Sequence, residues 1–178
     1  MTLEELQLAR DLVIYPNGKS RISLEEFARR YPLALEQGKL ALKVIEEANR
    51  KQSDDEVGAA LIIGATFGFT AEHVPVLCEL LHVDWHSCHE DIVSTLQKLK
   101  DPRAVNAVYR ATFVKHEYLA YDEFLGLARK CTWALADIGT SDALAKLHLL
   151  TASDKSVIAG YAKERIDNWD KEQKRKRA

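Results

Sequence analysis

Six side chains of types that bind metal ions lie within nine consecutive residues of this sequence. They are His82, Asp84, His86, Cys88, His89 and Glu90. A zinc ion needs three or four such ligands that converge at about 2.0–2.3 Å. The segment, however, is expected to span a helix end, a loop and a helix start. The rest of the sequence has no second group of potential ligands at a spacing typical of a metal site. We therefore predict no metal site, and we interpret these histidines as satisfied loop residues or as contacts to a partner.

The sequence lacks the motifs of common catalytic sites. It contains no glycine-rich phosphate loop, no Gly-x-Ser-x-Gly turn and no His-Glu-x-x-His pair. The cysteines Cys78, Cys88 and Cys131 match no zinc or disulfide spacing. Cys131 falls on the same apolar stripe as Leu135 and Ile138, where a buried thiol is inert. We expect neither enzymatic activity nor a cofactor.

Charge is unevenly distributed along the chain, although the formal net charge is only −2. The segment from Asp54 to Gln97 contains eight of the 27 acidic residues and none of the 25 basic ones. Acidic residues in the first turn of a helix are favoured by the helix dipole, which explains part of this block. A block of one sign on a folded surface also attracts opposite charge. The pattern favours a basic partner and disfavours direct binding of nucleic acid.

The longest uncharged stretch around the apolar centre runs from Val57 to Ala71 and has 15 residues. A membrane-spanning helix needs roughly 20 mostly apolar residues, so no membrane segment is expected. The first five residues, Met-Thr-Leu-Glu-Glu, also differ from the basic and then apolar start of a secretory signal. We predict a cytoplasmic protein with reduced thiols.

Helices must position all these side chains. Capping patterns begin at Thr2, Ser23, Ser53 and Ser87, each with a glutamate three residues later. We predict helices over residues 3–14, 24–31, 33–52, 55–66, 72–82, 88–99, 102–114, 123–138, 141–150 and 154–169. No segment alternates with a period of two for long enough to form a strand, so the predicted fold class is all-α.

The helices repeat in pairs. A shift of 39 residues aligns Leu96 with Leu135 and Leu99 with Ile138, and a shift of 35 aligns Val57 with Ile92. Short turns make neighbouring helices antiparallel, and a two-helix unit that stacks on its own copies is an α-solenoid. We predict a short α-solenoid as one domain. Its parts are a non-repeating helical N-terminal cap at 1–52 and repeats at 53–169 within a domain that spans 1–170, followed by a basic flexible tail at 171–178.

Residues 131–147 read CTWALADIGTSDALAKL and resemble the bacterial HEAT-like repeat, of the type also found in phycobilisome lyases. That pattern has an inner helix ending in Ala-Leu-x-x-Ile-Gly, a short Asp/Pro turn, and an outer helix of Ala-Leu-x-x-Leu form. Residues 92–108 are a weaker copy, with Lys100 where the glycine would stand. The resemblance covers roughly 53–169 and implies a HEAT-repeat solenoid that binds another macromolecule.

Three further segments resemble small HEAT-repeat proteins that act as immunity proteins beside bacterial toxins. They are WHSCHEDI at 85–92, YDE at 121–123 and ARKCTW at 128–133. This resemblance implies an antitoxin that binds and neutralises a cognate toxin domain. Nucleases carry cationic substrate grooves that an acidic surface can occupy, so the expected partner is a basic nuclease domain. The alternative is a general adaptor or lyase-like protein that serves a metabolic complex.

Alignment of the repeats places charged and aromatic side chains on one predicted edge, away from the core positions. Such a composition is typical of interface hot spots. Two alternatives stay open, namely that Trp133 packs against the next repeat and that Arg129 forms a salt bridge with Glu90. The predicted partner-binding residues are Asp55, Glu56, Asp84, Trp85, His86, Glu90, Asp91, Tyr121, Asp122, Glu123, Arg129, Lys130, Trp133 and Asp137.

Overall fold

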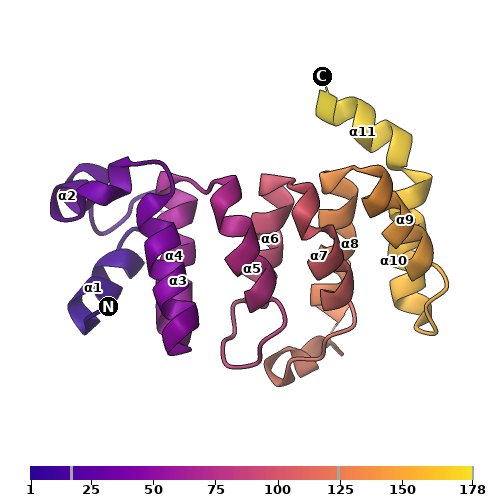
Figure 1. Cartoon of the computed structure of the whole chain (residues 1–178), viewed down its shortest axis with the longest axis horizontal. Coiled ribbons are helices and arrows are strands. Elements are labelled where there is room, and N and C mark those ends of the chain that lie inside the picture. The colour runs from indigo at the N-terminus through magenta and orange to yellow at the C-terminus, as the bar shows by residue number, and fades with distance from the viewer. Residues whose placement is uncertain (17, 124, 178) are drawn as a thin grey trace. The chain divides into compact units, whose positions relative to one another are not determined.

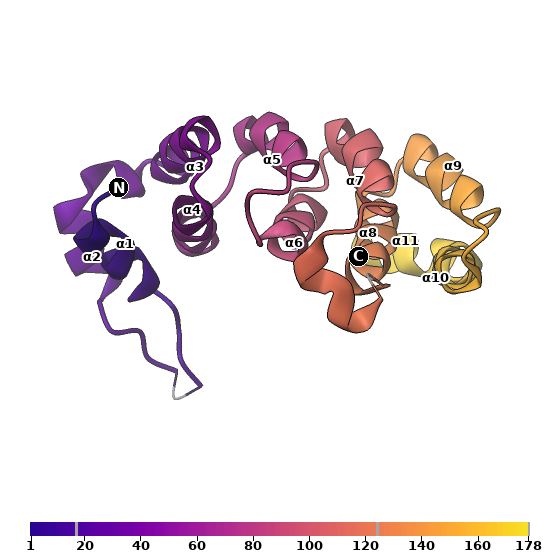
Figure 2. The ribbon, with the colours of Figure 1, turned by 90° about the horizontal axis from the view of Figure 1, so that it is seen from below.

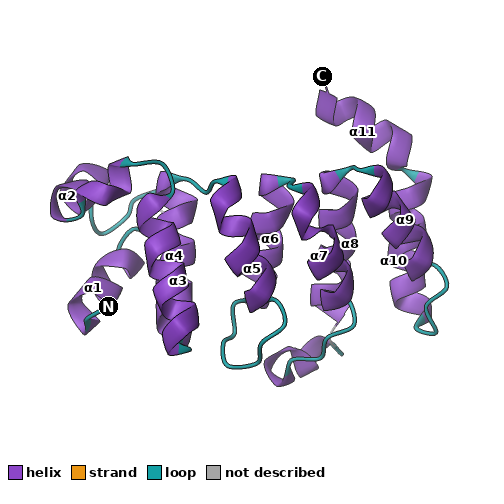
Figure 3. Ribbon diagram, in the orientation of Figure 1, coloured by secondary structure: helices purple, strands orange, loops and turns teal. Residues whose placement is uncertain are grey.

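The computed structural model describes residues 1–16, 18–123 and 125–177, with side chains up to Lys174 (Figure 1). Within these ranges the chain is all-helical and contains no strand (Figure 3). None of the helices in the described ranges is both long enough and apolar enough to cross a lipid bilayer. The all-α fold class is thereby confirmed. The chain divides into two compact units: unit 1 comprises residues 1–76 with 85–88, and unit 2 comprises 77–84 and the chain from 89 onward.

Unit 1 is built around a pair of adjacent helices, α3 and α4 (Figure 2). Its elements are α1 (Leu3–Arg10), α2 (Leu24–Arg30), the 3-10 turn η1 (Pro32–Leu35), α3 (Lys39–Lys51), α4 (Asp54–Phe67) and the 3-10 turn η2 (Ala71–His73). Helix α1 also packs against α4. Phe27, Ile45 and Ile63 are almost fully buried, and the Phe27 ring stacks on that of Phe67 at 5.5 Å. Burial of these large side chains holds the helices of unit 1 together.

Unit 2 is centred on α8, which contacts α6, α7, α9 and α10. Its elements are α6 (His89–Leu99), η3 (Pro102–Ala104), α7 (Val105–Ala111), η4 (Glu117–Asp122), α8 (Leu125–Ile138), α9 (Ser141–Leu150), α10 (Ser156–Asp167) and α11 (Trp169–Arg177), while α5 (Val74–Leu80) crosses the boundary between the units. The predicted core positions Ile92, Leu96 and Leu135 are fully buried. Cys131 is also fully buried, as its place on the apolar stripe predicts.

Three turns between helices have the same construction. In each, a residue with positive φ ends one helix: Gln52 (φ 54°), Lys100 (φ 54°) and Gly139 (φ 72°). The next residue then caps the following helix. The side chains of Ser53, Asp101 and Thr140 accept hydrogen bonds from the backbone N–H groups of Glu56 (3.4 Å), Arg103 (2.9 Å) and Ala143 (3.1 Å). The alignment of Lys100 with Gly139 therefore extends to backbone conformation, because both occupy the left-handed region.

The observed elements differ from the prediction at a few places. The helix expected at 33–52 is divided into η1 and α3, because the backbone at Gly38 has φ +77°, outside the right-handed helical region. A Cβ at this position would also lie 2.8 Å from the His73 ring, which favours glycine. Helix α1 ends at Arg10 rather than at residue 14, and η4 was not expected at all. The segment predicted as a flexible tail is helical as far as Arg177.

Candidate functional site

The acidic start of α4 lies in unit 1. Asp55 is exposed and forms an ion pair of 2.6 Å with Arg10. Glu56 is only 5% exposed. Its carboxylate accepts hydrogen bonds from the Met1 amino group and from Lys51 Nζ, the latter at 3.3 Å. The exposure expected for Glu56 is therefore not found, because the packing of α1 against α4 covers this carboxylate.

The pKa of Glu56 reflects two opposing influences. Burial raises it, but the hydrogen bonds and charges of the Met1 amino group and Lys51 together lower it below the ordinary glutamate value. Glu56 is thus an ionised, paired carboxylate within unit 1.

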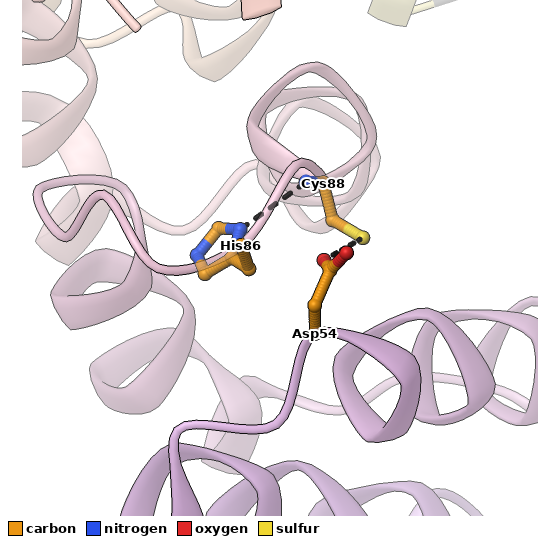
Figure 4. Close-up of side chains that lie close together, drawn as sticks. All are labelled: Asp54, His86 and Cys88. Carbon is orange, nitrogen blue, oxygen red and sulfur yellow. Dashed lines mark hydrogen bonds between the residues drawn. The ribbon is translucent and has the colours of Figure 1, made fainter.

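The loop of residues 85–88 returns to the start of α4 and places three potential metal ligands together (Figure 4). The Ser87 backbone N–H donates to Asp54 Oδ1 at 2.9 Å, and the Ser87 hydroxyl lies 3.2 Å from Oδ2. Cys88 Sγ lies 3.9 Å from Asp54 Oδ1, and the Cys88 N–H donates to His86 Nδ1 at 3.1 Å. One ligand atom each of Asp54, His86 and Cys88 lies within 4.8 Å of the other two.

Asp54 is the member that sequence reasoning missed, because it stands 32 residues before His86. The ligand types within 82–90 were visible in the sequence, but their convergence depends on the return of the loop to α4. Among the described residues, this is the one group of three potential ligands that meets this closeness.

The other candidates of that cluster have different surroundings. His89 is fully buried, with Nδ1 2.9 Å from the Tyr118 hydroxyl and Nε2 2.8 Å from the Val83 carbonyl oxygen. Both ring nitrogens are therefore engaged, as expected of a satisfied histidine. His82 and Asp84 are exposed, while Trp85 is half-buried and meets the His86 ring edge-on at 4.9 Å. His86 itself is buried.

In unit 2, the first turn of α6 carries Glu90 and Asp91. Asp91 is exposed, and its carboxylate forms no ion pair with any residue whose side chain is described. Glu90 Oε1 lies 4.0 Å from Lys130 Nζ. The alternative pair of Glu90 with Arg129 is not formed within the described structure, and Arg129 is exposed. The adjacent lysine approaches Glu90 instead.

The predicted residues around α8 divide into exposed and structural groups. Tyr121 is 77% exposed, and Glu123 is also exposed. Asp122 Oδ2 accepts the Gly126 N–H at 2.8 Å and so caps the start of α8. Asp137 accepts a hydrogen bond from the Gln97 side-chain amide and thereby links α8 to α6. Asp122 and Asp137 thus have structural partners inside unit 2.

Trp133 is packed on one side and open on another. The Arg165 guanidinium carbon lies 3.5 Å from the centre of the indole ring, so Trp133 does pack against α10. The residue is nevertheless 38% exposed. It lines a hollow of about 400 Å³ together with Asn168, Lys171 and Glu172. Trp133 therefore packs against a neighbouring helix, as one alternative predicted, and also keeps part of its ring exposed.

Two of the thiols are poorly suited to chemistry. Burial raises the pKa of Cys78 to about 11 and that of Cys131 to about 12. At neutral pH both stay protonated, and a protonated thiol is a weak nucleophile and a poor metal ligand. Cys88 alone of the three cysteines lies beside both a carboxylate and a histidine.

Comparison of the chain with protein-family models, with curated proteins and with solved structures gives no match. The family resemblance therefore stays a prediction that depends on the quoted residues, and any function has to be argued from the side chains described above.

Proposed function

We propose that this chain is a HEAT-like α-solenoid that acts as an immunity protein and neutralises a basic toxin domain, in the simplest case a nuclease. The shared turn at Lys100 and Gly139, which follows the aligned helices α6 and α8, supports the repeat part of the proposal. A helix pair closed by the same turn in successive units is what a stacked array of similar units requires.

The observation that carries the binding proposal is the charge at the start of α6. Asp91 is exposed in a segment that contains no lysine or arginine from residue 54 to residue 97. An uncompensated carboxylate of this kind attracts a cationic groove and speeds its association. Glu56 is left out of the proposed surface, because its carboxylate is buried and paired.

The test is whether this chain co-purifies with a basic toxin-like domain. We expect a one-to-one complex in which the activity of that domain is inhibited. Asp91→Lys should weaken the complex by about 2–5 kcal/mol, because it breaks a charge pair that becomes buried on binding. Isothermal titration calorimetry measures the affinity, and thermal unfolding shows whether the variant is folded.

Asp142→Lys provides the matched control. Asp142 is also an exposed aspartate in the first turn of a helix, α9. Each of the two charge reversals should therefore cost about 0.3–1 kcal/mol in helix-dipole energy. The control should bind like the unmodified chain. Equal affinities of all three proteins would refute the Asp91 surface. A stable complex that leaves the partner fully active would instead support the adaptor function.

A further inference from the structure

We propose that Asp54, His86 and Cys88 form a zinc site in unit 1. The inference is independent of the proposed partner, because all three residues and their supporting contacts belong to that unit. Asp54 is the first residue of α4, and the other two ligands come from the loop that precedes α6. Figure 4 shows the Asp54 carboxylate and the Cys88 sulfur pointing toward one another, with the His86 ring beside them.

The distances fit a tetrahedral ion after small side-chain rotations. With bonds of about 2.0 Å to oxygen and about 2.3 Å to sulfur, two such ligands of one zinc ion lie about 3.5 Å apart. Cys88 Sγ and Asp54 Oδ1 are already 3.9 Å apart. The three ligand atoms lie within 4.8 Å of one another, so closure needs shifts of roughly 1 Å that rotation about χ angles can supply.

The chemistry of the ligand set also suits zinc. Thiolate, imidazole and carboxylate are the three side-chain ligands that this ion takes in proteins. His86 Nδ1 accepts the Cys88 N–H, and zinc would replace that N–H as the partner of the ring nitrogen. On binding, the Cys88 thiol releases one proton to solvent. The thiolate and the Asp54 carboxylate then balance the two positive charges.

Neighbouring groups orient the carboxylate. The Ser87 N–H and hydroxyl both bind Asp54, which fixes the carboxylate while leaving it further lone pairs for an ion. Asp54 is exposed, so water can supply a fourth ligand. A zinc ion here would tie the 85–88 loop to the start of α4 more tightly than the Ser87 hydrogen bonds do alone.

The experiment titrates the full chain, stripped with a chelator, with zinc and with cobalt(II). We expect one equivalent of either ion to bind, and the cobalt form to show a thiolate-to-metal charge-transfer band. Cys88→Ser should abolish that band and weaken zinc binding at least 100-fold. Asp54→Asn and His86→Gln should each weaken it at least tenfold while retaining the band.

Cys78→Ser is the matched control, since Cys78 is also partly buried but has no place in the cluster. It should bind zinc like the unmodified chain. Absence of the charge-transfer band from the unmodified protein overturns the site, whatever the variants do. Equal zinc affinity of the Cys88→Ser and Cys78→Ser variants would also overturn it. If Cys88→Ser does not fold, the cobalt spectrum of the unmodified chain and the Asp54→Asn titration decide the question.

Discussion

Neighbouring carboxylates at the start of α4 have different roles. Asp54 holds the Ser87 loop, Asp55 pairs with Arg10 on the surface, and Glu56 is buried against Met1 and Lys51. In a helix, successive side chains are rotated by about 100° around the axis, so adjacent residues face different surroundings. Consecutive acidic residues in the sequence therefore do not form a uniform acidic surface.

Glu56→Gln should lower the free energy of unfolding at pH 7 by about 1–3 kcal/mol, because hydrogen bonds to a charged group are lost inside unit 1. The folded-state pKa of Glu56 is lower than its unfolded value. Its stabilising effect is thus fully present above the unfolded pKa and is lost as pH falls through the folded pKa. Urea unfolding at pH 7 and at several acidic pH values should show the difference between the two proteins narrowing in acid.

Asp55→Asn serves as the control at the same helix start. Its ion pair with Arg10 is exposed on both sides, so the loss should stay within about 1 kcal/mol. A Glu56→Gln effect no larger than that of Asp55→Asn, or one that persists unchanged in acid, would contradict the structural role of Glu56.

At the scale of elements, the repeated turn places a lysine in a conformation that suits glycine. Lys100 has φ 54° and ends α6, whereas the aligned position after α8 is Gly139 with φ 72°. The left-handed region costs an ordinary residue about 1–2 kcal/mol, and glycine avoids this cost but loses more entropy on folding. The conformation is imposed by the short turn to the Asp101 cap rather than by Lys100 itself.

Lys100→Gly should therefore stabilise the protein relative to Lys100→Ala by about 1 kcal/mol, since both variants remove the same charge and differ only in the backbone cost. Chemical unfolding measures the difference. The same pair of substitutions at Lys98, an exposed position inside α6, should show the opposite order, because glycine is unfavourable within a helix. If the alanine variant is the more stable protein at both positions, the left-handed conformation of Lys100 is contradicted.

Helix α11 shows how contacts outweigh composition. Its sequence is rich in lysine and arginine, which is typical of a solvated tail. Two of its side chains nevertheless attach it to the preceding helices of unit 2: Glu172 binds the buried Arg165 at 2.8 Å, and the Gln173 amide donates to the Ala136 carbonyl oxygen at 2.8 Å. These contacts give the segment fixed partners on α10 and α8.

At the scale of the whole molecule, the proposed solenoid predicts an extended particle. A compact chain of 178 residues has a radius of gyration of about 16 Å. Stacked repeats should give a clearly larger radius of gyration in small-angle X-ray scattering. The distribution of interatomic distances should have a tail toward long distances. Light scattering on the same sample must show a monomer, because a dimer would also enlarge the radius. A monomer with a radius near the compact value would contradict the solenoid.

The sequence alone was sufficient to predict most of the helices. Helix α9 spans the predicted residues 141–150, and the predicted caps at Thr2, Ser23 and Ser53 accept their backbone hydrogen bonds. The hydroxyl of the fourth predicted cap, Ser87, instead binds the Asp54 carboxylate. Caps and apolar periodicity involve residues three or four positions apart, so they are encoded in short windows. The buried core of α6 and α8 follows from the same periodicity.

Only the tertiary structure decided which side chains meet over long distances in the chain. Asp54 joins His86 and Cys88, His89 binds Tyr118, and Trp133 stacks on Arg165. These partners lie about 30 residues apart, and their approach depends on how helices pack and where loops return, which no short window contains. The helices could thus be predicted residue by residue, whereas the burial of Glu56 and the convergence at Asp54 arise only once the helices are packed.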